Sequence, residues 1–261
     1  MKRNRLSLAM TGLALAVGGC GLLVWEPARV KYIDALEEGK MRRGVPTEAK
    51  AIARIRERGV LLVFPINNRL EPPSLWSEFF PKTPMVWDWN EDGDMRVAEM
   101  WQLMKRLSQT GEVVYSKWYQ GRATFFSREL FTAMLAFQRH RSDLRRGLSS
   151  GAKTAMEVLE NNSPLSTREL KKMTDLQGRA HETEYNRAMK ELFARLLIVG
   201  FGEFEDGAFP SLAVGATELL FSDLWTRAED MRMSEAESVI ECFMPQGSHF
   251  RRYFGRNAPE S

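Results

Sequence analysis

An acidic segment in the first half of the chain has the residue types and spacing of a calcium-binding loop, D-x-[DN]-x-[DN]-G-x5-E. Carboxylate and amide oxygens at this spacing can surround a hard cation, and the glycine permits the sharp turn that such a loop needs. The candidate ligands are Asp88, Asn90, Asp92 and Glu99.

The surrounding residues favour a simpler interpretation of this segment. Pro81 and Pro84 interrupt the helix that should enter a calcium loop, and the positive charge of Arg96 would repel the cation. An acidic loop in which Asp94 caps a helix beginning near Arg96 explains the same residues without a metal. Two cysteines and three separated histidines also provide no disulfide framework and no zinc site, so we expect no cofactor.

A second group of polar side chains, in the second half of the chain, is suited to nucleic-acid binding. These side chains are spaced to lie on one face of a helix, where they can contact phosphates and base edges. The group consists of Arg179, Thr183, Asn186, Arg187 and Lys190. The opposite face is apolar with the period of an amphipathic helix. It contains Tyr185, Ala188, Met189, Leu192, Phe193 and Leu196.

Two shorter helices are predicted before this one. The first begins at Thr154 and has several apolar residues. The second has Ser166 or Thr167 as its N-cap. Its spacing predicts that Leu170 and Met173 face inward.

Two β-like runs follow the third helix, and the Asp-Gly at their junction, residues 205–207, is typical of a hairpin. The runs are Leu197–Phe204 and Phe209–Val214. Three helices and a hairpin are the elements of a winged-helix module, in which the third helix enters the DNA major groove. The same module also serves protein contacts, and Glu182, Glu184 and Glu191 on the third helix would repel phosphate, so both partners stay open.

Another hairpin is predicted in the first half, where Val113–Tyr119 and Arg122–Phe126 flank residues 120–121. Its interleaved aromatic and basic residues can stack bases while they hold phosphates, with Lys117 and Arg122 as the phosphate contacts. The alternative is a hairpin whose aromatic face packs in the core and whose basic face is in solvent.

The other elements of the first half predict a second α+β unit, compatible with a degenerate winged helix. They are helices at Thr47–Arg58, Val97–Leu107 and Glu129–Gln138, and a buried strand at Val60–Ile66. The expected fold class is therefore α+β, mostly helical, with winged helix-turn-helix modules and small β-hairpins.

The net charge of +3 permits a polyanionic partner without requiring one. Basic residues are concentrated in three stretches, at residues 42–58, 139–146 and 251–256. A charge run is usually a solvated surface, but three of them around a predicted helix-turn-helix favour phosphate contact. We therefore expect double-stranded DNA as the partner.

The N-terminal sequence suggests a cellular location that differs from that of a DNA-binding protein. A basic start precedes an uncharged run from Leu6 to Trp25, which is typical of a secretory signal or of a marginal membrane span. Cys20 ends a lipobox-like sequence and would be lipidated in an envelope protein. An anchor at residues 6–25 with a cytoplasmic body is disfavoured by the positive-inside rule. The last alternative is a cytoplasmic protein that starts at Met41.

Several short segments resemble the AlkZ-related bacterial proteins, over about residues 45–225. These segments are Gly59–Ile66, Pro73–Trp76, Tyr115–Lys117, Arg122–Ser127 and Glu184–Leu192. AlkZ-related proteins are distant relatives of the AlkZ/YcaQ DNA glycosylases, which are built from winged helices and unhook alkylated bases and interstrand crosslinks. The resemblance implies a winged-helix protein of DNA repair, and it favours Met41 as the start.

The catalytic pair of those glycosylases has no counterpart here. The family uses Gln-x-Gln or Gln-x-Asp to position water and to stabilise the developing sugar cation. Alignment with the family places Leu62 and Phe64 there, and neither can do this chemistry. The nearest polar residues are Asn67, Asn68 and Glu71. Glu71 is the best remaining acid for a rearranged site.

We therefore expect a winged-helix DNA-binding protein that is related to repair glycosylases and lacks their catalytic pair. Two alternatives are an active glycosylase with a rearranged site and an envelope protein that uses the winged helix for protein contact. The expected division is an apolar leader and linker at 1–40, an N-terminal α+β domain at 41–146, a winged-helix domain at 147–223 and a C-terminal helical tail at 224–261.

Overall fold

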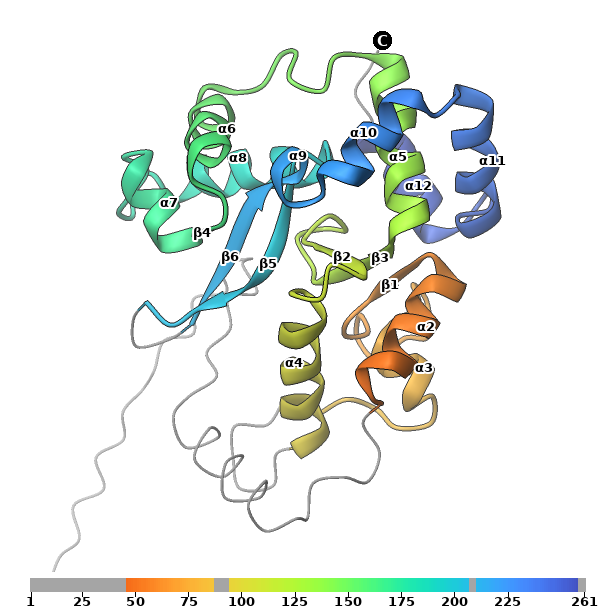
Figure 1. Ribbon diagram of the computed structural model, residues 1–261. Coiled ribbons are helices and arrows are strands. Elements are labelled where there is room, and N and C mark those ends of the chain that lie inside the picture. Colours follow the sequence, from red (N-terminus) through yellow and green to blue (C-terminus); the bar gives the residue numbers. More distant parts are fainter. Residues whose placement is uncertain (1–45, 87–93, 207–209, 258–261) are drawn as a thin grey trace, which may run out of the picture.

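The computed structural model describes residues 46–86, 94–206 and 210–257, whose strands form one antiparallel sheet (Figure 1). In this part of the chain the sheet has six strands in the order β1-β3-β2-β5-β6-β4. They are β1 Val60–Leu62, β2 Val113–Ser116, β3 Thr124–Ser127, β4 Leu165–Ser166, β5 Ile198–Phe204 and β6 Ser211–Ala216. Helices contribute more residues than strands, so the fold is α+β and mostly helical, as predicted.

The first three strands share a hydrophobic core with helices α2 (Glu48–Arg58), α3 (Leu75–Phe79) and α4 (Met95–Leu107). The apolar faces of these helices meet in one core. Its largest fully buried members include Ile55, Leu61, Leu75, Trp76, Met100, Leu103 and Leu107. Side chains alternate along β1, so that Leu61 joins this core while its neighbours Val60 and Leu62 join a second core on the other side.

Local sequence sets the ends of these helices. The Thr47 side chain accepts a hydrogen bond from the Lys50 N–H at the start of α2, and Asp94 does the same for α4. Gly59 ends α2 with φ +73°, a left-handed conformation that glycine adopts without strain. Strand β1 ends at Leu62, earlier than predicted, because Pro65 has no N–H to donate and residues 67–68 turn with positive φ.

The second part of the chain contains α6 (Ser150–Asn162), α7 (Thr167–Met173) and α8 (Glu182–Ala194) before the β5–β6 hairpin. All these elements are predicted by the sequence. Strand β4 between α6 and α7 is not, and it pairs with β6. The inward placement of Met173 is wrong: its side chain is 45% exposed, because α7 ends at this residue and only Leu170 is buried on it.

Helix α5 (Arg128–Arg141) follows β3 and is capped by the Ser127 side chain, and four more helices follow the β5–β6 hairpin. They are α9 Thr217–Leu220, α10 Ser222–Asp230, α11 Met233–Phe243 and α12 His249–Asn257. Helices α10 and α11 pack against α5, as Figure 1 shows. Helix α12 packs on the turn between β2 and β3.

The two parts of the sheet join where β2 pairs with β5, at Tyr115 and Gly200. The join requires glycine: a Cβ atom at position 200 would lie 2.2 Å from Cδ1 of Tyr115. A second contact supports it, because the N–H of Gly202 donates a hydrogen bond of 3.0 Å to the Oγ of Ser108, at the end of α4.

The substitution Gly200→Ala should destabilise the protein by about 1–3 kcal/mol, because the buried Tyr115 ring must shift to admit the methyl group. The free energy of unfolding in urea measures this. Gly255→Ala is the matched control: Gly255 lies in α12 with open space around it, so alanine should raise stability by about 0.5–1 kcal/mol. Equal effects of the two substitutions would contradict the close approach.

Candidate nucleic-acid interface

Helix α8 has the predicted apolar face. Five residues of the helix on that face are buried against α6 and β5: Tyr185, Ala188, Met189, Leu192 and Phe193. Leu196, the sixth predicted residue, lies just beyond the helix and is also buried. The period of the sequence therefore determines which side of α8 faces solvent.

The exposed side of α8 carries the predicted polar residues. Thr183, Asn186, Arg187 and Lys190 are exposed on the helix, and Arg179 is exposed just before it. The Asn186 amide donates a hydrogen bond of 3.2 Å to a carboxylate oxygen of Glu182. In the described part of the chain, neither Arg187 nor Lys190 forms an ion pair with a carboxylate.

The acidic residues of α8, by contrast, have partners. The Lys171 ammonium lies 2.6 Å from Glu182 and holds the pKa of that carboxyl below its ordinary value. Glu191 pairs with Arg195 at 3.1 Å and accepts a hydrogen bond of 2.7 Å from the Ser149 hydroxyl. The third carboxylate, Glu184, is 3.8 Å from His181 Nδ1. Two of the three carboxylates that would repel phosphate are thus compensated by cations.

The hairpin that follows α8 is tied to α7. Burial opposes the charged form of Asp206, but hydrogen bonds from Ser166 and Ser211 and the nearby Arg168 outweigh it and lower the pKa of this carboxyl. The Arg168 guanidinium also donates a hydrogen bond of 2.6 Å to the Asp206 carbonyl. Residues 207–209, at the tip of the hairpin, lie outside the described residues.

The aromatic side chains of the first hairpin pack in the core. They are Tyr115, Trp118, Tyr119, Phe125 and Phe126, and none is more than 4% exposed. Base stacking on these rings is therefore the wrong alternative, and the packed aromatic face is the correct one. Lys117 is half-buried near Glu203, whereas Arg122 is exposed in the turn.

The region aligned with the glycosylase pair is built for packing. Leu62 is fully buried in the core, and Phe64 packs against the core formed with α2 to α4. Asn68 forms two hydrogen bonds with the Met85 backbone, one accepted at 2.7 Å and one donated at 3.0 Å. Asn67 and Glu71 are exposed. Asn68 therefore ties this loop to the segment at Met85.

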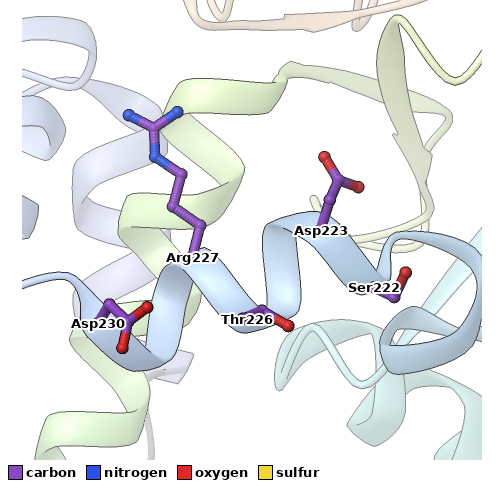
Figure 2. A pocket seen from close by; sticks show the side chains of 5 residues that line it. All are labelled: Ser222, Asp223, Thr226, Arg227 and Asp230. Atoms are coloured by element: carbon purple, nitrogen blue, oxygen red, sulfur yellow. The ribbon is translucent and has the colours of Figure 1, made fainter.

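A small cavity of about 230 Å³ lies beside this loop. Its lining includes Asn68, Arg69, Trp76, Phe80 and Lys82, so it has aromatic walls and two cations, but no carboxylate. A second hollow runs along α10, and Figure 2 shows its polar side chains projecting from successive turns in different directions. The hollow along α10 includes two carboxylates, Asp223 and Asp230, and the first of these pairs with Arg128.

Only part of the candidate calcium loop can be described. Asp88, Asn90 and Asp92 lie outside the described residues, and Glu99 lies on α4. Burial, aided by the negative charge of Asp94, raises the pKa of Glu99. Asp94 caps α4, as predicted, and pairs with Arg96 at 2.7 Å. Among the described residues, no group of three or more histidine, cysteine or acidic side chains could hold a metal ion.

Many arginines of the three basic stretches form ion pairs. The pairs are Arg54 with Glu57 and Glu78, Arg56 with Glu112, Arg58 with Glu78, Arg139 with Glu229, Arg145 with Glu160 and Glu218, and Arg251 with Glu241. A stretch of basic sequence therefore overstates the charge that is available to a polyanion.

The N-terminal leader lies outside the described residues, and with it Cys20, the run at residues 6–25 and the alternative start Met41. Within the ranges described, every helix is too short or too polar to cross a membrane.

The substitution Asn68→Ala should cost about 1–3 kcal/mol more stability than Asn67→Ala, because only Asn68 ties the loop to Met85. The two positions make a matched pair, since both have positive φ, 56° and 51°, and share the backbone cost of losing asparagine. Thermal unfolding of both variants measures the difference. Equal losses would show that the two hydrogen bonds contribute no stability.

Comparisons with known proteins support one relationship. The sequence model of the AlkZ-related family matches residues 45–246, which is most of the chain. No curated protein matches the chain, and no solved structure matches it. The chain therefore belongs to the AlkZ-related family.

Proposed function

We propose that this protein binds duplex DNA through a winged-helix module at residues 150–216, with α8 as the helix that enters the major groove. The observation that carries the proposal is the exposed face of α8. Its two cations, Arg187 and Lys190, have no ion-pair partner in the described part, while Glu182 and Glu191 are paired with cations. Unpaired cations beside amide and hydroxyl groups suit a surface that contacts both phosphates and base edges.

The elements around α8 support this role. Helices α6 and α7 precede α8, β4 pairs with β6, and β5 and β6 form the hairpin that would be the wing. This is the element order of a helix-turn-helix protein whose final helix reads DNA. The links from Ser166 and Arg168 to Asp206 fix the wing against α7, so that wing and helix can approach one duplex together.

The proposal includes DNA as partner but not glycosidic cleavage. Membership of the AlkZ-related family connects the chain to repair glycosylases, which supports a DNA substrate class. The position of the family's catalytic pair is occupied by Leu62, which is fully buried, and by Phe64. Burial of each such side chain contributes about 1.5–3 kcal/mol to stability, so these residues serve the core.

We expect the protein to bind duplex DNA with weak sequence preference and steep salt dependence, because its cations displace counterions from phosphates. Changing both Arg187 and Lys190 to Glu should nearly abolish binding. Fluorescence anisotropy with a labelled duplex measures the affinity. The charge-matched control is Arg227→Glu, on α10, with Arg232→Glu, just before α11, and it should lose much less affinity.

Binding that survives in the folded Arg187/Lys190 variant would remove α8 as the reader. Absence of binding by the unmodified protein at low salt would refute the proposed function as a whole.

The purified protein should release no base from alkylated or crosslinked DNA above background. Cleavage passes through a cationic sugar that must be stabilised while water is aligned, and Leu62 and Phe64 supply neither function. Chromatography of released bases measures this. Clear release that is lost in Glu71→Gln, Asn67→Ala or Asn68→Ala would show instead a rearranged catalytic site.

A further inference from the structure

The turn between β2 and β3 is covered by α12 through ring packing. Trp118 lies with its ring centroid 4.9 Å from that of Tyr253, and Tyr119 lies 5.1 Å from Phe250 and 4.8 Å from Tyr253. In the described residues, the Trp118 Nε1 and the Tyr253 hydroxyl have no hydrogen-bond partner. Ring packing therefore sets where α12 sits on the turn.

This packing brings three arginines from two segments to one place. The N–H of Arg122 donates a hydrogen bond of 2.9 Å to the carbonyl of Tyr119, which closes the turn and keeps Arg122 beside that ring. Arg252 and Arg256 are four residues apart on α12 and so lie on one face, on either side of Tyr253 in sequence. All three are exposed.

The electrostatics of Tyr119 agree with this placement. Burial raises the pKa of its phenol, while Arg256, Arg252 and Arg122 each act in the opposite direction. Three guanidinium groups are thus within electrostatic reach of one hydroxyl. None of the three forms an ion pair with a carboxylate in the described residues, although their neighbour Arg251 pairs with Glu241 at 3.8 Å.

We propose that Arg122, Arg252 and Arg256 form a phosphate-binding surface, the turn–α12 surface, that holds the DNA backbone outside the contact made by α8. Guanidinium groups bind phosphate oxygens with charge-assisted hydrogen bonds, and repulsion among three of them is relieved when an anion is present. Because the groups are exposed and come from two segments, they suit a polymer with a phosphate at each nucleotide. This inference rests on the proposed DNA binding.

The test compares the salt dependence of binding in three proteins. The unmodified protein, the variant R122Q/R252Q/R256Q and the control K50Q/R227Q/R232Q are titrated against one labelled duplex of about 30 base pairs, between about 50 and 200 mM salt. The control residues are Lys50 on α2, Arg227 on α10 and Arg232 just before α11. All three are exposed, and none forms an ion pair in the part of the chain that the structure describes. Glutamine removes the charge and keeps a good helix former in α12.

We expect the slope of log K against log salt to become shallower by about 2–3 in the R122Q/R252Q/R256Q variant, because each lost phosphate contact removes roughly 0.9. The control should change by less than about 1. Should the triple variant fail to fold, R122Q alone, in the turn, should still reduce the slope by roughly 1.

If the folded triple variant still binds DNA and its salt slope equals that of the control, the turn–α12 surface does not contact phosphate. The role proposed for α8 would be unaffected. Absence of binding by the unmodified protein would overturn both proposals.

Discussion

The arrangement of this molecule depends on one close approach, the contact of Tyr115 on β2 with Gly200 on β5. Without a side chain at position 200, the two strands pair, and the sheet continues from β1 to β4 across both parts of the chain. The Tyr115 phenol is buried at this contact. Its burial, together with the negative charge of the nearby Glu203, raises the pKa of the phenol and keeps it neutral. A bulkier residue at 200 would displace the Tyr115 ring and weaken the pairing that joins the two parts of the sheet.

Because one sheet carries both parts, it also relates the two proposed DNA contacts to each other. Helix α8 leads directly into β5, and β5 pairs with β2, which begins the hairpin whose turn supports α12. Helix α8 and the turn–α12 surface are therefore linked through two paired strands. A DNA duplex that contacts both would be held at two places by elements of one hydrogen-bonded sheet, which favours tight non-specific binding.

Local sequence predicts much of this fold. The period of α8 identifies its buried face, and Thr47, Asp94, Ser127 and Ser166 cap the helices that follow them. Local sequence patterns do not predict the contacts between segments that are separated in the chain. Met173 has helical spacing but lies at the end of a short helix. The pairing of Glu182 with Lys171, and the meeting of Arg122 with α12, depend on how helices and turns pack, which no local pattern encodes.

The same limit explains why net charge says little about this protein. Its net charge is +3, and six of the ten described arginines in the basic stretches pair with carboxylates of other elements, whereas Arg252 and Arg256 do not. Cations become available only where packing leaves them without such a partner, as on α8 and on the turn–α12 surface. A weakly charged chain can therefore present two local cationic surfaces, and their position depends on which carboxylates the fold places beside which arginines.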